Sequence, residues 1–387
     1  MDARVISMLV NQPDTLNGRL EILHQAILQK VPAITRLSCA LYDVQTDELK
    51  TFLTSCLSGT SAEKHELLLA DSPHLAELAK NIQYCAVNVD AGFNQLDPDH
   101  AAWLREKGYR STFIVPMLQG QRFIGFIFFD AIEADVFGDS VQRELILHVQ
   151  IINMTIAAEM SLVQSLLATT KIARDFADMR DFETGLHLDR MAHYAHIIAR
   201  YLAPKYQLSD EWIEHIFMFA ALHDIGKIGV PDKILCKPGR HNDEEREIMK
   251  THVNKGVVLL QRLLADYDLV NMRDTELMMN IVAYHHEYLD GSGYPNGLSG
   301  DQIPLEARIS TVADIFDALT SRRPYKKAWS IDAALEELQS MTASGKLDPD
   351  CVQAVIDERE EFEHIVNLLA DEQDKRSADD IMKGFQR

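Results

Sequence analysis

One segment constrains the fold of this chain more than any other, because no glycine or proline interrupts the residues from Ser140 to Glu183. Asp139 or Ser140 is a suitable N-cap for a helix that begins there. Apolar residues then follow at spacings of three and four, which places them on one helical face; they are Val141, Leu145, Val149, Ile152, Ile156, Val163 and Leu166. The segment predicts a long connecting helix over residues 139–180, with a separate region on either side.

The length of this helix allows two interpretations. It has more apolar surface than one small sheet can cover, so it could be a rigid connector that also forms the seam of a homodimer. Alternatively, it could be a helix that closes the N-terminal domain, followed by a second and separate helix. We favour the dimer seam, although Glu159 within the apolar stripe counts against it.

The region before the long helix has the pattern of an antiparallel sheet with helices packed on it. Residues 1–30 show the apolar spacing of a helix. Residues 36–57 and 112–130 each contain two apolar stretches joined by a short turn, which is the signature of a β-hairpin. We therefore expect an α+β domain over residues 1–160.

The region after the long helix has helical spacing almost throughout. Loops rich in glycine and proline interrupt it at residues 226–240 and 290–305, and the last predicted helix is Pro349–Leu369. We expect an all-α domain over residues 176–372. Residues 373–387 form a charged tail that we expect to be loosely attached.

The composition excludes several classes of protein. The chain has 38 lysines and arginines against 59 aspartates and glutamates, which gives a formal net charge of −21. Binding to a nucleic-acid polymer needs a basic surface instead. The longest strongly apolar run, Phe123–Phe129, has about a third of the length that a membrane-spanning helix needs. We therefore expect neither a nucleic-acid polymer nor a membrane among the partners.

The N-terminus and the cysteines indicate the cytoplasm. Residues 1–10 lack the charged start, the long apolar core and the small-residue cleavage site of a signal peptide. The five cysteines have no CxxC spacing, which argues against a disulfide framework or a zinc ribbon and fits a reducing compartment; they are Cys39, Cys56, Cys85, Cys236 and Cys351.

The histidines are unevenly distributed along the chain. Five of the 15 histidines lie in the first 160 positions and ten in the remainder, although acidic residues occur in both regions. Imidazole nitrogen is a good ligand for iron, manganese, zinc and nickel. His223-Asp224 stands at the end of an apolar helix, His285-His286 precedes a glycine-rich turn, and His252 lies within a helix.

Carboxylates accompany these histidines. Glu183 and His187 are four residues apart, so they share one face of a helix. Asp314 and Asp317 lie one turn apart in an apolar helix, where a buried carboxylate is costly unless it is paired or ligates a metal. Each residue alone has an ordinary structural explanation. Together they suit two or more metal ions bridged by a shared carboxylate, a centre that activates water and binds a phosphodiester.

Residues from about 180 to 370 resemble the HD-GYP phosphodiesterases, a branch of the HD hydrolases that cleaves the bacterial messenger cyclic di-GMP. The matching stretches are Glu183-Thr184-Gly185-Leu186-His187, His223-Asp224-Ile225-Gly226-Lys227-Ile228-Gly229-Val230-Pro231, Lys237-Pro238-Gly239, the helix of His252, His285-His286-Glu287 through Asp290-Gly291 to Gly293-Tyr294-Pro295, and Ala313-Asp314-Ile315-Phe316-Asp317-Ala318-Leu319-Thr320. The departures from the family pattern, such as Val253 after His252, replace no ligand.

The resemblance implies a set of metal ligands. A first metal position would be formed by His187, His223, Asp224 and Asp314. A second position, bridged to the first through Asp224, would be formed by His252, His285 and His286. Glu183 resembles the extra carboxylate of members that build a third position. The resemblance thus implies two or three divalent ions, with iron or manganese favoured over nickel, cobalt or zinc.

The resemblance also implies residues that act on the substrate. His223, Asp224 and Lys227 would form the catalytic group, with Lys227 holding a phosphate. Arg323 and Lys326 resemble the cations that grip the phosphate and guanine portions. An acidic chain needs such local positive charge to bind a dianionic cyclic dinucleotide. The loop of Gly293-Tyr294-Pro295 would border the mouth of the site, place Tyr294 against the substrate, and dock partner proteins such as diguanylate cyclases.

The N-terminal region resembles a GAF domain, a sensory module that binds small ligands or dimerises. The matching residues are Cys39–Asp43, the hairpin of Thr112–Leu118 with Gly120 and Phe123–Phe129, and the helix after residue 139. There is no attachment signature for haem or bilin, and the resemblance identifies no ligand. Cys39, Cys56 and Cys85 are predicted to be buried as small hydrophobic residues.

Together these resemblances predict a cytoplasmic signal-transduction hydrolase. It would convert cyclic di-GMP to linear pGpG and, because Glu183 is present, onward to GMP, under the control of the GAF domain. Two alternatives stay open: a protein that binds cyclic di-GMP as an effector or docking protein with little turnover, and an HD phosphohydrolase for another nucleotide. The complete ligand set favours the enzyme, and Tyr294, Arg323 and Lys326 favour cyclic di-GMP.

Overall fold

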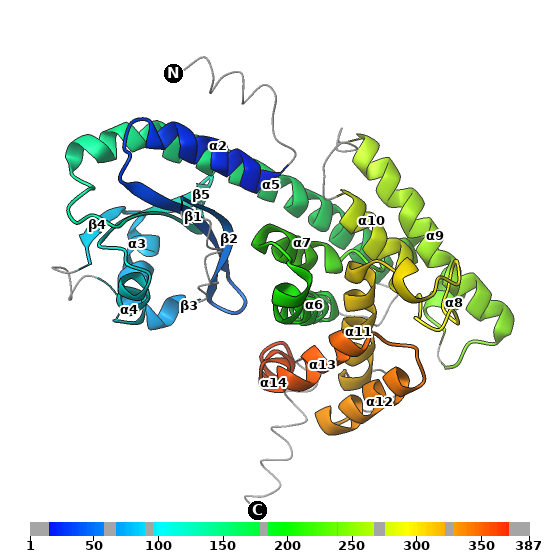
Figure 1. Ribbon diagram of the computed structural model, residues 1–387. Helices are drawn as coiled ribbons and strands as arrows, with labels where there is room; N and C mark the ends of the chain where they lie inside the picture. The colour runs from blue at the N-terminus through cyan, green and yellow to red at the C-terminus, as the bar shows by residue number, and fades with distance from the viewer. Residues whose placement is uncertain are drawn as a thin grey trace, which may run out of the picture. The chain divides into compact units, whose positions relative to one another are not determined.

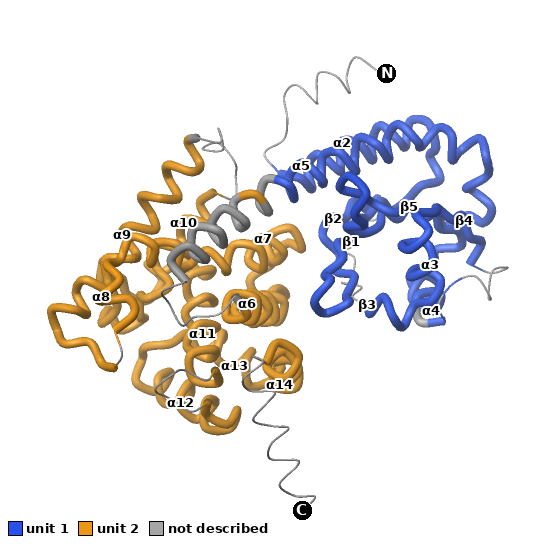
Figure 2. The backbone as a smooth tube through the Cα atoms, turned by 180° about the vertical axis from the view of Figure 1, so that it is seen from behind, with its two compact units in different colours: residues 1–163 blue, residues 164–387 orange. Residues whose placement is uncertain are grey.

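The computed structural model describes residues 15–57, 67–89, 96, 98–178, 185–237, 239–266, 275–321 and 328–370. The chain divides into two compact units, residues 1–163 and residues 164–387, which Figure 2 shows in separate colours. Among the described helices, none combines the length and the apolar character that crossing a bilayer requires.

The N-terminal unit is built on one antiparallel sheet of six strands (Figure 1), as the sequence predicts. The strands are β1 (Ile34–Asp43), β2 (Glu48–Cys56), β3 (Leu67–Leu68), β4 (Cys85–Asn88), β5 (Ser111–Gln119) and β6 (Arg122–Ala131). Their order is β3-β2-β1-β6-β5-β4, so the two predicted hairpins, β1–β2 and β5–β6, lie side by side. The pairing of β1 with β6 joins the hairpins and sets Ser38 opposite Phe128.

Helices cover both faces of this sheet. On one face, α2 (Leu16–Leu28) and the first half of α5 (Asp139–Asp178) bury Leu20, Ile27, Leu145 and Ile152 against the sheet. On the other face, α3 (Pro73–Asn81) and α4 (Pro98–Glu106), with the short helix η1 (Leu69–Asp71), form a second apolar core around Phe126. The predicted α+β fold of this region is therefore confirmed as a three-layer arrangement.

The predicted long helix is continuous. Helix α5 runs from Asp139 to Asp178 without a break, which disagrees with the interpretation of two separate helices. Leu145, Ile152 and Ile156 are each about 1% exposed, so this part of the predicted apolar stripe packs on the sheet. The side chains of Val163 and Leu166, which belong to the same stripe, lie outside the described residues. The division between the two units falls within this helix, at residue 163.

The C-terminal unit is helical, as predicted. Its helices are α6 (Gly185–Tyr206), α7 (Asp210–Ala220), η2 (Ile225–Gly229), α8 (Asp232–Leu235), α9 (Asp243–Asp266), α10 (Thr275–Tyr284), η3 (Gly300–Gln302), α11 (Leu305–Thr320), α12 (Ile331–Ala343), α13 (Pro349–Asp357) and α14 (Arg359–Leu368). Among the described residues of this unit, the one extended pairing is a single bridge between Asp290 and Ser299.

One helix of this unit differs from the prediction. The sequence predicts a single helix over Pro349–Leu369, but α13 ends at Asp357 and α14 begins at Arg359. The break at Glu358 lets each half bury its own apolar side chains, Val355 in α13 and Phe362 in α14. Phe362 then stacks on the buried ring of Tyr194 of α6. Helical spacing alone does not reveal such a change of direction.

Candidate metal centre

Five helices bring the predicted ligands of the C-terminal unit together. The ligands lie near the start of α6, in the turn after α7, in the middle of α9, directly after α10, and within α11; they are His187, His223, Asp224, His252, His285, His286 and Asp314. Their ligand atoms form two groups, and within each group all of them lie within 4.8 Å of one another. The first group contains His187, His223 and Asp314, and the second contains Asp224, His252, His285 and His286.

Asp224 lies between the two groups. Its Oδ2 atom is 3.1 Å from Nε2 of His223, and its Oδ1 atom is 3.1 Å from Nε2 of His252 and 3.8 Å from Nε2 of His285. The same Oδ2 atom is 2.7 Å from the ammonium group of Lys227. One carboxylate thus faces both groups with different oxygens, which is the arrangement of a bridging ligand.

The histidine rings are fixed by their Nδ1 atoms. Nδ1 lies 2.9 Å from the Ala220 carbonyl oxygen in His223, 2.7 Å from that of Met249 in His252, and 3.1 Å from that of Ile281 in His285. A carbonyl oxygen accepts only, so we infer that the proton of each neutral ring is on Nδ1. Each Nε2 atom then presents a lone pair toward the centre, as a metal ligand must.

The unpaired atoms of the site test whether a cation fits there. Nε2 of His187, His223, His252 and His285 is buried without a hydrogen-bond partner, and so is Oδ1 of Asp224. With the proton on Nδ1, the contact between His252 Nε2 and Asp224 Oδ1 brings two acceptors within 3.1 Å. Buried acceptors in this arrangement need a cation between them, so the donor set fits divalent metal ions.

The electrostatics of the site favour ligation as well. Burial, reinforced by the neighbouring His286, holds the pKa of His285 well below its usual range, and burial lowers the pKa of His286 to about 4. Burial opposes ionisation of Asp224, but Lys227 and His223 outweigh it and hold the pKa of this carboxyl well below its usual range. Two imidazoles are therefore neutral and the carboxyl is ionised, as metal ligands are.

His223 behaves differently. Burial opposes its charged form, but the carboxylates of Asp224 and Asp314 outweigh burial and raise the pKa of His223 to about 9. In the metal-free protein a proton on this ring partly compensates the negative charge of the two carboxylates. A bound cation would replace that proton.

A close approach between η2 and α9 brings His252 to Asp224. A Cβ atom on Gly226 would lie 1.9 Å from the carbonyl oxygen of His252 and 2.3 Å from the backbone nitrogen of Gly256. Glycine is therefore required two residues after Asp224, because any side chain would separate the two elements.

The loop of Tyr294 is held against the candidate ligands by Glu287, to which no role is assigned from the sequence. The buried carboxylate of Glu287 accepts hydrogen bonds from the backbone nitrogens of Asn296 at 2.7 Å and Leu298 at 3.0 Å. The backbone nitrogen of Tyr294 donates to the carbonyl oxygen of His286. The Tyr294 ring then lies 4.7 Å from the His286 ring, between centroids. The sequence signal that could have identified Glu287 is its position directly after the predicted ligand pair His285-His286.

Asp317 does not join Asp314 in the ligand groups. Its Oδ2 atom lies 2.7 Å from Nδ1 of His187, and its Oδ1 atom accepts from Nε of Arg190 at 2.6 Å. Burial opposes ionisation of Asp317, but His187 and Arg190 lower its pKa to about 2. Asp317 thus contacts the candidate ligand His187 and is not itself in a ligand group.

Three predicted site residues, Glu183, Arg323 and Lys326, lie outside the described residues. The histidines of this unit without a predicted metal role have other surroundings. Nε2 of His196 contacts Glu214 Oε1 at 2.9 Å, and Nε2 of His241 contacts the carbonyl oxygen of Ile234 at 2.7 Å.

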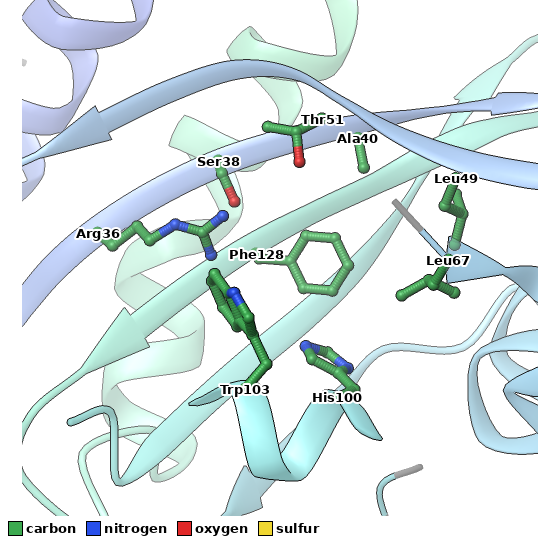
Figure 3. A pocket seen from close by; sticks show the side chains of 9 residues that line it. All are labelled: Arg36, Ser38, Ala40, Leu49, Thr51, Leu67, His100, Trp103 and Phe128. Carbon is green, nitrogen blue, oxygen red and sulfur yellow. The ribbon is translucent and has the colours of Figure 1, made fainter. Parts of the chain in front are cut away.

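The N-terminal unit has a pocket of its own between β1, β2, β6 and α4 (Figure 3). Arg36, Trp103, His100 and Phe128 are among its lining residues, and the guanidinium of Arg36 lies over the Trp103 ring. The space open to the centre of a water molecule is about 20 Å³, which is room for about one water. As predicted, Cys39 is buried, but Cys56 and Cys85 are only partly so.

A protein-family model matches the C-terminal half of the chain. Residues 169–351 match the family model described as the HD domain. The C-terminal half of this chain carries an HD domain. The predicted HD resemblance is therefore confirmed at the level of this domain, and the seven candidate metal ligands lie within its boundaries.

Two curated relatives match the part of the chain that includes the HD domain. The cyclic di-GMP phosphodiesterase response regulator RpfG of Xanthomonas campestris is 45% identical over 189 residues, covering 49% of this chain and 47% of that protein. The 3'3'-cGAMP-specific phosphodiesterase 2 of Vibrio cholerae is 39% identical over 195 residues, covering 50% and 35%. The chain thus spans about half, or less, of the length of these relatives.

A solved GAF domain/HD domain protein from Geobacter sulfurreducens is also similar to part of this chain. The match has a TM-score of 0.32 and 15% sequence identity, and it covers 38% of this chain and 95% of that one.

Proposed function

We propose that the HD domain is a metal-dependent phosphodiesterase that hydrolyses cyclic di-GMP to linear pGpG. The observation that carries the proposal is the position of Asp224, whose two oxygens face two separate groups of ligand atoms. A two-metal centre of this kind suits in-line displacement at a phosphodiester. The names of curated relatives support the substrate, since several are called cyclic di-GMP phosphodiesterases.

In this proposal the first metal is held by His187, His223, Asp224 and Asp314, and the second by Asp224, His252, His285 and His286. Glu183 would add a third position, and iron or manganese is favoured over nickel, cobalt or zinc. The bound ions would supply Lewis acidity and a nucleophilic water at neutral pH. The Nε2 atoms that the backbone carbonyls aim at the centre support this assignment.

Positive side chains would bind the anionic substrate. Lys227, whose ammonium group is already at the bridging carboxylate, would hold the phosphate that is attacked. Arg323 and Lys326 would grip the remaining phosphate and the guanine. Tyr294 would offer its ring at the mouth of the site, where it packs on His286. With Glu183, a second cleavage from pGpG to GMP is part of the proposal.

The test is chromatography of the reaction products, with protein whose metal content is measured first. We expect turnover of cyclic di-GMP to pGpG with manganese or ferrous iron, the latter protected from air. Protein that carries metal and gives no product would overturn the enzyme and leave the proposed alternative of an effector or docking protein.

A second substrate is favoured by a specific observation. Two relatives named as 3'3'-cGAMP-specific phosphodiesterases are 39% and 38% identical to this chain, similar to one named for cyclic di-GMP at 38%, while a third is 28% identical. The two dinucleotides, compared under one metal at equal concentration, separate these candidates. A higher kcat/KM for 3'3'-cGAMP would overturn the proposed specificity while leaving the phosphodiesterase intact.

We also propose that the N-terminal unit is a GAF-type sensor that regulates the HD domain.

A further proposal is that the chain forms a cytoplasmic homodimer through helix α5. Apolar side chains lie on the face of α5 opposite its packed stripe; Ile146, Leu147 and Met154 are 51%, 67% and 70% exposed. Leu147 and Met154 are seven residues apart, a spacing that suits a helix–helix seam. A stable dimer by light scattering that Leu147→Glu converts to monomer is the expected result.

The loop of Gly293-Tyr294-Pro295 is a proposed docking site for diguanylate cyclases. The loop is anchored at its base by Glu287, and Tyr294 is partly exposed. A purified diguanylate cyclase that binds the wild type and a Tyr294→Ala variant equally well would exclude it.

A further inference from the structure

Behind His187, on the side away from the other ligands, lies a buried network of charged and polar side chains. Asp317 of α11 is at its centre: Oδ2 contacts His187 Nδ1 at 2.7 Å, while Arg190 of α6 donates to Oδ1 at 2.6 Å and to Oδ2 at 3.2 Å. The hydroxyl of Ser321 also donates to Oδ2, at 3.0 Å. Asp317 is 1% exposed and Arg190 5%, so the network is almost completely shielded from water.

This surrounding distinguishes His187 from the other histidines of the centre. The Nδ1 atoms of His223, His252 and His285 contact backbone carbonyls, which are neutral. The Nδ1 atom of His187 instead contacts an ionised carboxylate that is itself held on both oxygens. A hydrogen bond to a charged acceptor is about twice as strong as one between neutral groups. It also fixes the ring more firmly and makes the opposite nitrogen a better electron donor.

We infer that Asp317 is a positioning residue for the metal position of His187, and that Arg190 holds Asp317 in the geometry this requires. With its proton drawn to Nδ1, the His187 ring presents Nε2, which is buried and has no hydrogen-bond partner, to the group of His223 and Asp314. The two metal positions are therefore inequivalent, because only the first has a carboxylate behind one of its imidazoles among the described ligands.

The network extends beyond the metal ligand. Arg190 also donates to the hydroxyl of Ser321 at 2.7 Å and to the carbonyl oxygen of Leu369 at 3.0 Å. Leu369 follows α14, and Ser321 precedes in sequence the segment with the proposed substrate cations Arg323 and Lys326. The same arginine thus joins the His187 position to Ser321, at the end of α11, and to Leu369, at the end of the domain's last described helix.

The test measures manganese affinity in the full-length chain, by competition with a chelator. It rests on the proposed metal centre but needs no substrate. His252→Ala, which removes a ligand of the second group, isolates the position of His187. In this background we expect Asp317→Asn, which keeps the shape of the side chain but not its charge, to weaken manganese binding by about 10- to 100-fold.

The opposite background provides the discriminating control. In His187→Ala protein, which retains the second group, Asp317→Asn is expected to change the manganese affinity less than two-fold, as is typical of uncoupled sites. A matched variant is Asp348→Asn, because Asp348 is 4% exposed and pairs with Arg308 at 2.7 Å, outside the ligand groups. It should leave both affinities unchanged.

The outcomes separate the inference from the proposed function. If the wild type binds neither manganese nor ferrous iron, the metal centre itself is wrong and the inference falls with it. If the wild type binds manganese and Asp317→Asn weakens neither position, or weakens both equally, only the inference is overturned. Should Asp317→Asn not fold, Ser321→Ala removes one hydrogen bond from the same carboxylate. This variant must then lower the manganese affinity of the His187 position alone, by a few-fold. An unchanged affinity overturns the inference.

Discussion

His24 in the N-terminal unit and His223, His252 and His285 of the candidate metal centre are all buried, but their ring nitrogens have different numbers of partners. His24 has a partner on each ring nitrogen, with Nδ1 2.8 Å from the Ser55 hydroxyl and Nε2 2.9 Å from the carbonyl oxygen of Ile34. His223, His252 and His285 have such a partner on Nδ1 alone, and their Nε2 atoms are buried without a hydrogen bond. An unsatisfied buried polar atom destabilises a fold. Several of them aimed at one point therefore indicate a ligand.

The largest effect should follow from removing the carboxylate that faces both groups. We expect Asp224→Ala to lose metal from both positions and to reduce hydrolysis by more than the roughly 100-fold typical of outer partners of metal ligands. Elemental analysis and product chromatography measure the two losses. A variant that keeps its full metal content would show that Asp224 does not bridge.

The next effect is on stability. A ligand at 100 times its dissociation constant stabilises a folded domain by about 2.7 kcal/mol, so chelation should lower the unfolding temperature of the HD domain. The N-terminal unit, with both nitrogens of His24 already satisfied, should be unaffected. Calorimetry with and without a chelator measures the unfolding temperatures of the two units. Equal shifts in both temperatures would show that the HD domain does not depend on metal more than the N-terminal unit does.

Substitution of one histidine in each unit compares them directly. We expect His24→Leu to cost about 1–3 kcal/mol, because it leaves the polar groups of Ser55 and Ile34 without a partner. In metal-free protein, His285→Leu should cost less, since Nε2 has no partner to lose and only the contact of Nδ1 with the backbone is removed. Chemical denaturation of both variants measures the difference. A larger cost for His285→Leu would mean that Nε2 of His285 has a partner in the metal-free protein.

The smallest effect is a dependence on pH. The pKa of His286 is lowered by burial to about 4, against 6.5 for an exposed histidine. The unfolded chain therefore takes up a proton that the folded chain refuses. The free energy of unfolding of the metal-free protein should fall as the pH drops from about 6.5 toward 4. In His286→Gln the decline should be shallower, and denaturation curves at several pH values measure it.

Local sequence patterns anticipated much of this molecule. The uninterrupted run after Asp139 predicts a helix, and α5 is continuous to Asp178. Two polar turns between apolar stretches predict the hairpins β1–β2 and β5–β6. These features depend on residues near one another in the chain. The break between α13 and α14 was missed because it depends on how Val355 and Phe362 pack against distant helices.

The candidate ligands were also visible in the sequence, and the structure brings seven of them together, while their binding of metal stays a prediction. The sequence alone determined that this chain carries a histidine-rich set on several helices, because residue type and short spacing are properties of the chain itself. The family resemblance had already chosen Asp314 as the candidate ligand, and only the tertiary structure decided how Asp314 and Asp317, one turn apart on the same helix, divide their contacts. One faces His187 and His223, and the other binds Nδ1 of His187 and Arg190. That division depends on where α6 lies against α11, a contact between residues more than 100 positions apart.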